Sequence, residues 1–201
     1  MQFSFPRGHI VAAVADRGFS AISRCVGAAG RGRRPWLQSG VETQRHLRRL
    51  DRTWVDSPVY FITTCTNNRR ALLARREIAN ILIDEWTAAR DRHGWAVGRY
   101  VIMPDHVHFF CRPEYESKTL SQFMGAWKRW SSRSAHNVLR PRPATAATTP
   151  FWQREFFDHV LRSSESYSEK WNYVFENPVR ADLVARADDW PYAGEIETLM
   201  L

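Results

Sequence analysis

The sequence predicts an α+β fold in which an antiparallel sheet carries helices on one face. Three observations predict it. Four runs rich in β-branched and aromatic residues alternate with two amphipathic helical segments in the order β-α-β-β-α-β. A tight turn at Pro104 and Asp105 joins the second and third runs. A further helical segment follows the fourth run. This order matches a split βαβ unit of the ferredoxin-like type with an extra C-terminal helix.

The boundaries of the predicted elements in the first half of the pattern are marked by turn-forming residues. Pro58 precedes the first β-rich run, and Asn67 follows it closely. The next segment has apolar residues at helical spacing, and Gly94 provides its stop. The predicted elements are the strand 59–66, the helix 75–92, and the strands 95–103 and 106–112.

The second half begins with a helix whose apolar stripe contains aromatic residues beside cations. A loop rich in Pro, Ala and Thr separates this helix from the fourth strand. Ser163 or Ser164 can cap the last helix, and Asn177 followed by Pro178 stops it. The predicted elements are the helix 119–139, the loop 140–150, the strand 151–161 and the helix 165–176, which carries Tyr173.

With 201 residues, the chain can form one well-buried domain plus an appendage. Residues 1–51 are predicted to be a basic, disordered extension, since the first 50 residues hold nine arginines against two acids and lack periodicity. The alternatives for this extension are a nucleic-acid-binding tail and coding sequence upstream of the true start. The domain is predicted at 52–193, followed by a C-terminal tail at 194–201.

The net charge of +8 suggests a polyanionic partner. No apolar run approaches the ~20 residues needed to span a bilayer, so no membrane partner is expected. The three cysteines are far apart, which argues against a disulfide framework and a cysteine-based zinc site. We therefore expect a cytoplasmic protein.

His106 and His108 are separated by one apolar residue at the start of a predicted strand. Because successive strand side chains point to opposite faces, both imidazoles should face the same way. Two aligned neutral imidazoles form half of a divalent-metal site. An isolated pair of this kind is more often two surface histidines, so the prediction depends on further groups from elsewhere in the chain.

Tyr173 and Asn177 can supply those groups. They are four residues apart, so they share a helix face. If that face packs over the histidines, His106, His108 and Asn177 would hold Mg²⁺ or Mn²⁺, with open positions for a phosphate oxygen. Tyr173 would then attack phosphorus and form a phosphotyrosine link to DNA.

Each assignment has a competing interpretation. Tyr173 could be an ordinary core tyrosine, and Tyr167 is a competing nucleophile, although only Tyr173 has Asn177 one turn away. Asn177 could be a simple helix cap before Pro178. His159 could belong to a metal or DNA site, but a structural histidine is the more common case. Asp105 fits a turn former better than a ligand.

These residues carry a resemblance. The segment Pro-Asp-His106-Val-His108 resembles the His-hydrophobic-His motif of single-tyrosine HUH transposases. The run that starts at Tyr173 and continues through Asn177-Pro-Val is similar to the signature of one branch, the REP-associated tyrosine transposases. The segments 151–159 and 189–192 are similar to that branch too. The resemblance implies Tyr173 as nucleophile, His106 and His108 as metal ligands, and Asn177 at the third ligand position.

The resemblance also implies the substrate. It indicates single-stranded DNA with hairpins from repetitive extragenic palindromes, cut through a covalent 5′-phosphotyrosine intermediate. No small-molecule substrate is implied. Related transposases include obligate dimers and monomers, so a homodimer is one arrangement that the sequence leaves open.

Cations for phosphate contact are concentrated between Ser117 and Arg142, a span without acids. Trp127 and Trp130 lie among them, as stacking residues do in single-strand binders, but tryptophans at helical spacing are more often core. The candidate DNA-binding residues are Lys118, Lys128, Arg129, Arg133, Arg112 and Arg180. The leading prediction is thus a metal-dependent nicking and strand-transfer enzyme. The rivals are a non-catalytic nucleic-acid-binding module of ferredoxin-like fold and an inactive, domesticated transposase remnant.

Overall fold

The computed structural model describes residues 58–139, 149–161 and 163–200. The predicted extension at 1–51, the start of the predicted domain and most of the predicted loop 140–150 lie outside these described residues. Within them, no helix is both long enough and apolar enough to cross a membrane. The cytoplasmic location stays a prediction.

Five strands form one antiparallel sheet in the spatial order β4-β1-β3-β2-β5. They are β1 (Val59–Cys65), β2 (Trp95–Ile102), β3 (His106–Pro113), β4 (Phe157–Leu161) and β5 (Ala193–Glu195). β1 and β3 are paired neighbours although β2 separates them along the chain. This is the connectivity of the predicted split βαβ unit, so the α+β fold is confirmed.

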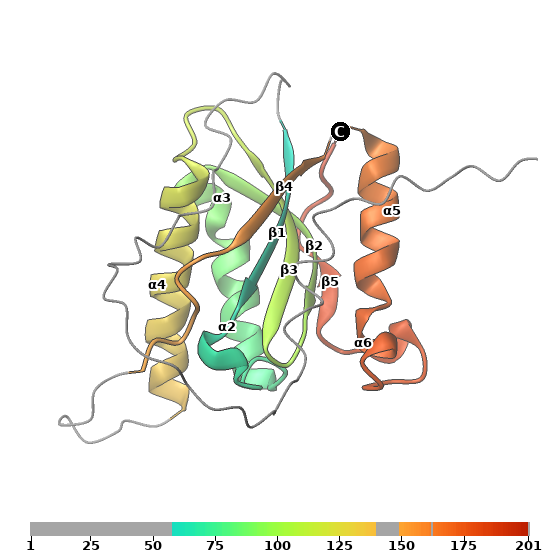
Figure 1. Cartoon of the computed structure of the whole chain (residues 1–201). Helices are drawn as coiled ribbons and strands as arrows, with labels where there is room; N and C mark the ends of the chain where they lie inside the picture. The colour runs from blue at the N-terminus through green and yellow to red at the C-terminus, as the bar shows by residue number, and fades with distance from the viewer. Residues whose placement is uncertain (1–57, 140–148, 162, 201) are drawn as a thin grey trace, which may run out of the picture. The chain divides into compact units, whose positions relative to one another are not determined.

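Three helices cover one face of the sheet (Figure 1). They are α2 (Arg76–Thr87), α3 (Ala89–His93) and α4 (Leu120–Val138). α4 begins at a capping box, in which Thr119 and Gln122 each accept a hydrogen bond from the other's backbone N–H. Gly94 ends α3 with a φ of 71°, where a side-chain carbon would lie 2.8 Å from the Ser117 Cα.

The predicted single helix 75–92 is wrong at Ala88, where α2 ends and α3 begins. The N–H of Ala88 bonds to the carbonyls of Asp84 and Trp86, which closes α2 with a tightened last turn. Apolar residues continue at helical spacing through this break, because Trp86 and Ala89 are both buried against the sheet. The periodicity therefore did not reveal it.

Two helices lie on the opposite face of the sheet, α5 (Ser164–Phe175) and α6 (Asn177–Arg180) (Figure 1). Of the two predicted caps for α5, the structure selects Ser163, whose hydroxyl accepts from the Ser166 N–H at 3.2 Å. Pro178 stands in the first turn of α6, where a missing N–H costs nothing.

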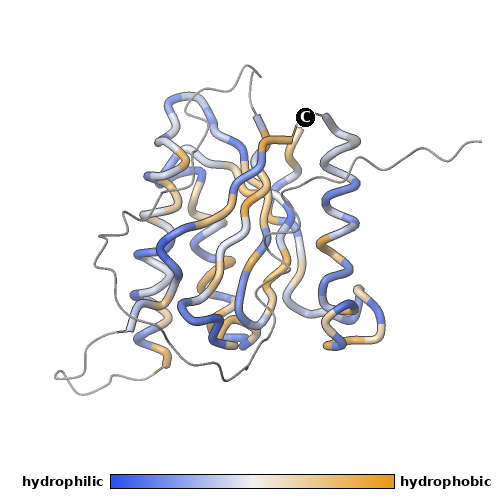
Figure 2. Tube along the Cα trace, viewed as in Figure 1, coloured by the Kyte–Doolittle hydropathy of each residue, from blue (hydrophilic) through white to orange (hydrophobic). Residues whose placement is uncertain are grey.

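The two sheet faces bury separate apolar clusters, and β3 contributes to both. Val107 and Phe109 pack with α2 and α4, whereas Phe110 packs with Tyr167 of α5. Figure 2 shows hydrophobic residues along the central strands and many hydrophilic residues on the outer helices. Because side chains on β3 alternate, His106 and His108 share the α5 face with Phe110.

The fourth strand begins later than predicted, at Phe157 rather than Phe151. The preceding carbonyls, of residues 153–155, accept hydrogen bonds from the ammonium of Lys128 instead of from a neighbouring strand. Trp152 is buried against α4, and its indole N–H donates to the Ser131 hydroxyl at 2.9 Å. The C-terminal residues add β5, which is too short for a recognisable alternation.

Candidate active site

The two histidines of β3 lie side by side on the α5 face of the sheet. The centroids of the His106 and His108 rings are 4.8 Å apart, and the rings are nearly perpendicular at 85°. β1 is the neighbouring strand, and its register places Cys65 opposite His106 and Thr63 opposite His108. The predicted alignment of the imidazoles is present in the structure.

His108 is fixed by its neighbours on β1. Its Nδ1 lies 2.8 Å from the Thr63 hydroxyl oxygen, and its ring stacks on Phe61 at 5.5 Å with an interplanar angle of 14°. Only 7% of His108 is exposed. Burial, followed by the positive charges of His106, Arg69, Arg180 and Lys170, holds the pKa of His108 well below its ordinary value. The imidazole is therefore neutral at physiological pH, as a metal ligand must be.

His106 is held by the acid that precedes it. Its Nδ1 lies 2.6 Å from one carboxylate oxygen of Asp105, and the other oxygen accepts from the Nε of Arg69 at 2.9 Å. Burial alone would raise the pKa of Asp105, but the hydrogen bond and charge of His106 and the charge of Arg69 lower it. Because an ionised carboxylate only accepts hydrogen bonds, the Nδ1 of His106 is the donor.

The two imidazoles can supply two of the ligands that a divalent cation needs. Each histidine uses its Nδ1 for a protein contact, so each has its Nε2 available for a ligand. Among the described residues, no group of three or more His, Cys, Asp and Glu side chains could hold a metal ion. A third protein ligand must therefore be of another type, and the amide oxygen of Asn177 is such a donor.

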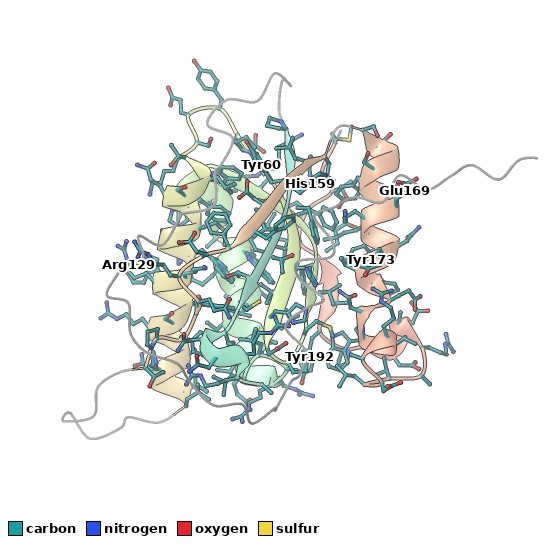
Figure 3. All side chains as sticks on the ribbon, viewed as in Figure 1. Tyr60, Arg129, His159, Glu169, Tyr173 and Tyr192 are labelled. Carbon is teal, nitrogen blue, oxygen red and sulfur yellow. The ribbon has the colours of Figure 1, made fainter. Side chains whose placement is uncertain are left out.

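α5 packs on the sheet beside the histidines. The Tyr167 ring lies 4.5 Å from that of Phe110, and the Lys170 ammonium lies 5.6 Å from the ring of Phe61, on which His108 stacks. Tyr167 is buried, as expected for a core tyrosine. Tyr173 is 44% exposed on α5, next to the sheet (Figure 3). The helix that carries Tyr173 thus packs on the same face of the sheet as the two histidines.

Arg180 connects the two predicted residues of the C-terminal helices. Its guanidinium donates to the amide oxygen of Asn177 and to the main-chain carbonyl of Tyr173. Asn177 is half-buried and begins α6, whereas Glu176 caps α5, so the interpretation of Asn177 as that cap is wrong. The roles of Tyr173 as nucleophile and Asn177 as ligand stay predictions.

The remaining cationic candidates lie away from the histidines. α4, on the other sheet face, carries Arg129 and Arg133 as exposed side chains, and Figure 3 shows Arg129 at the outer side of that helix. Lys128 donates to three main-chain carbonyls. Lys118 donates to the carbonyl of Arg92. Arg112 bonds to Glu114 and to the carbonyl of Met200.

The tryptophans of α4 have different environments. Trp127 is buried and stacks on Trp86 at 5.5 Å, so it belongs to the core. Trp130 is 44% exposed, with the Arg133 guanidinium 5.9 Å from its ring centroid. Only Trp130 is therefore available as a stacking surface for a base.

Three side chains at the histidine site, Thr63, Arg69 and Lys170, carry no signal in the sequence that marks them. Thr63 stands directly opposite His108 in the β1–β3 register. The alternation of β1 places Thr63 and Cys65 on one face. The contact between Thr63 and His108 depends in addition on the register of β1 against β3, which the sequence does not give. Arg69 reaches Asp105 from the short helix η1 (Asn67–Arg69), which no periodicity indicates.

Three comparisons with known proteins bear on this site. The family model described as "Transposase IS200 like" matches residues 55–176. A REP-associated tyrosine transposase of Escherichia coli (strain K12) is 23% identical over 143 residues, which cover 71% of this chain and 79% of that protein. An uncharacterized protein of Haemophilus influenzae is 21% identical over 167 residues, covering 70% of this chain and 91% of the relative.

A solved structure of a REP-associated tyrosine transposase bound to a REP hairpin is similar in fold. The TM-score is 0.55 at 20% sequence identity, and the match covers 73% of this chain and 82% of that one. At this identity, the likeness concerns the fold. It supports an α+β fold with a five-stranded antiparallel sheet and helices.

Proposed function

We propose that this chain, which belongs to the IS200-like transposase family, is a metal-dependent nuclease and strand transferase for single-stranded DNA. One observation carries the proposal. The helix with the exposed Tyr173 covers the same sheet face as the aligned pair His106 and His108. Such an arrangement offers a phenol nucleophile on the same face as two imidazoles that could ligate a cation, which supports phosphoryl transfer to a tyrosine.

In this proposal, the Nε2 atoms of His106 and His108 and the amide oxygen of Asn177 would hold Mg²⁺ or Mn²⁺. The cation would polarise the scissile phosphate and balance its charge. The protein contributes two imidazoles whose Nδ1 atoms contact Thr63 and Asp105, which would leave the Nε2 atoms to the cation. Asn177 must exchange its contact with Arg180 for the cation.

Tyr173 would form the covalent intermediate. Its phenol oxygen bonds to phosphorus, and the bond between phosphorus and the 3′ oxygen of the preceding nucleotide breaks. The phenol proton leaves to solvent, and the 3′ oxygen takes up a proton and becomes a hydroxyl group. The 5′ phosphate of the downstream strand remains joined to Tyr173 as a phosphotyrosine ester, which a second 3′-hydroxyl can attack in strand transfer.

The DNA substrate is inferred from relatives and from charge. Two relatives are named for REP sequences, and one was solved with a REP hairpin. The chain carries a net charge of +8, and α4 exposes Arg129 and Arg133. We therefore propose a single strand with a REP-like hairpin as the substrate.

Covalent capture tests this proposal. Full-length protein, a labelled hairpin-bearing single strand and Mn²⁺ should yield a protein–DNA adduct that survives denaturing electrophoresis. Tyr173→Phe should abolish the adduct and leave hairpin binding intact, whereas Tyr167→Phe, in the buried cluster, should retain it. His106→Ala and His108→Ala should each abolish cleavage. Hairpin binding without any cut strand would instead support a non-catalytic module or an inactive transposase.

A further inference from the structure

Asp105 forms a bridge between His106 and an arginine from a different part of the chain. One carboxylate oxygen lies 2.6 Å from the Nδ1 of His106, and the other lies 2.9 Å from the Nε of Arg69. Arg69 also donates from Nη1 to the sulfur of Cys65 at 2.7 Å. Cys65 is the strand partner of His106, so the contacts run from His106 to Asp105, to Arg69 and back to the neighbouring strand.

The backbone around this bridge is fixed as well. The N–H and the hydroxyl of Thr66 both donate to the carbonyl of Asp105, at 2.8 and 3.1 Å. Asn68 and Arg69 have positive φ values of 56° and 52°. Residues other than glycine rarely adopt this backbone conformation, which costs about 1–3 kcal/mol per residue and persists where the surroundings enforce it. The chain therefore accepts a locally unfavourable turn that brings Arg69 to Asp105.

A turn-forming aspartate does not require these contacts. Asp105 would need to accept only from nearby backbone groups to stabilise the turn between β2 and β3. Instead, both carboxylate oxygens bind side chains, one on the candidate ligand and one on a cation. The Arg69 side chain is 37% exposed, so the ion pair between Arg69 and Asp105 adds little to the stability of the fold by itself. These contacts point to a role in orienting His106.

We propose that Asp105 and Arg69 are positioning residues for the metal ligand His106. Asp105 accepts the Nδ1–H of His106, which fixes the neutral tautomer with its lone pair on Nε2 and sets the plane of the ring. Arg69 holds the carboxylate in place from its other side. The inference rests on the proposed function, because it assigns the Nε2 of His106 to the cation.

The expected effect follows from how such groups act elsewhere. Carboxylates behind metal-binding histidines raise ligand basicity and fix the ring, and their removal lowers metal affinity about 10–100-fold. Asp105→Ala should therefore weaken Mn²⁺ binding within this range. Asp105→Asn keeps a hydrogen-bond acceptor and should lose less. Arg69→Ala leaves the contact to His106 and should also lose less than Asp105→Ala.

The deciding experiment measures the tautomer without metal or DNA. Nitrogen-15 spectra of the metal-free full chain at about pH 8 should show His106 as the Nδ1–H form in the wild type. Asp105→Ala should shift it toward the Nε2–H form, and calorimetry should show weaker Mn²⁺ binding. Glu85→Gln is the matched control, since Glu85 pairs with Arg92 at 2.8 Å on the other side of the sheet and should change neither quantity.

The outcomes separate this inference from the proposed function. An unchanged tautomer and unchanged Mn²⁺ affinity in folded Asp105→Ala would overturn the positioning role while leaving the nuclease proposal intact. A tautomer shift in a protein whose wild type binds no Mn²⁺ would support the orientation by Asp105 and reject the metal site. If Asp105→Ala fails to fold, Asp105→Asn and Arg69→Ala decide by the same two measurements, since each retains part of the bridge.

Discussion

The guanidinium of Arg180 lies over the ring of Tyr173, with 4.1 Å between its central carbon and the ring centroid. The same guanidinium donates to the amide oxygen of Asn177. Arg180 thus contacts both residues that the proposed mechanism needs, the ring of the nucleophile Tyr173 and the amide oxygen of the third ligand Asn177. A phosphate that binds Arg180 would compete with these contacts, because a phosphate accepts stronger, charge-assisted hydrogen bonds than an amide.

Arg180→Ala should have opposite effects on the two ligands of the site. Removing the guanidinium frees the Asn177 oxygen, so Mn²⁺ affinity measured by calorimetry should rise. Hairpin DNA affinity measured by fluorescence anisotropy should fall, because a phosphate contact is lost. Exposed contacts of this kind contribute about 0.5–1 kcal/mol, so each change should be about two- to fivefold.

Arg186→Ala is the control for this substitution. Arg186 pairs only loosely with Asp188, at 3.7 Å, and both side chains are more than two-thirds exposed. Its removal subtracts the same charge and should leave Mn²⁺ affinity unchanged. A fall in Mn²⁺ affinity in Arg180→Ala would show that the arginine supports the ligand rather than competing for it.

Thr63→Val should weaken Mn²⁺ binding by about tenfold, because the buried Nδ1 of His108 loses its hydrogen-bond partner at 2.8 Å. Thr63→Ser keeps the hydroxyl and should restore most of the affinity. Thr64→Val is a matched control on the next position of β1, since the buried Thr64 hydroxyl makes no hydrogen bond in the structure. Equal affinities of the two valine variants would argue against a role for Thr63.

Lys128 and Arg129, neighbours in sequence, should respond differently to substitution. Lys128→Ala removes an ammonium that bonds three carbonyls between Trp152 and Phe156, so it should lower the free energy of unfolding by about 1.5–3 kcal/mol in urea titrations. Arg129→Ala should leave stability unchanged. It should reduce the slope of hairpin affinity against salt concentration by about one.

This pair distinguishes two uses of a basic helix. If Arg129→Ala leaves the salt dependence of DNA binding unchanged, the outer side of α4 does not contact phosphate. If Lys128→Ala changes DNA affinity and leaves stability unchanged, its ammonium serves the DNA rather than the segment 153–155.

Local patterns were enough to predict the succession of the first four strands and the helices along the chain, and the histidine pair. The alternation of β3 fixes the common face of His106 and His108, and the spacing in α5 relates Tyr173 to Asn177. Both relations depend only on residues close in sequence. The contact between Thr63 and His108 spans 45 positions and depends on the register of two strands that are not consecutive.

Side-chain contacts to irregular backbone could not be predicted either. Arg69 reaches Asp105 through a turn with positive φ values at non-glycine residues, which no turn signature indicates. Lys128 was indistinguishable from Arg129 as a surface cation, because its carbonyl partners lie beyond residues 140–148 in the chain. The start of β4 could not be predicted either, because the carbonyls of residues 153–155 accept hydrogen bonds from the distant Lys128.

The metal-free protein should lose stability on mild acidification. Burial and nearby cations lower the pKa of His93, and burial with neighbouring positive groups lowers that of His108 well below the ordinary 6.5. The unfolded chain therefore binds more protons than the folded one below about pH 6.5. The contribution of these two histidines to the free energy of unfolding levels off above this pH and should fall by up to about 1.4 kcal/mol per pH unit for each group as the pH drops toward the folded pKa.

Urea titrations in the presence of a chelator, at about pH 7.5, 6.5 and 5.5, measure this slope. His108→Gln should flatten it more than His93→Gln, because the pKa of His108 is lowered further. The acid Asp105 does not interfere, since its lowered pKa places its titration below the ordinary value of 3.8. A slope that is as steep in a variant with both substitutions as in the wild type would mean that neither imidazole is kept neutral by the fold, and the neutral state of His108 would then need another explanation.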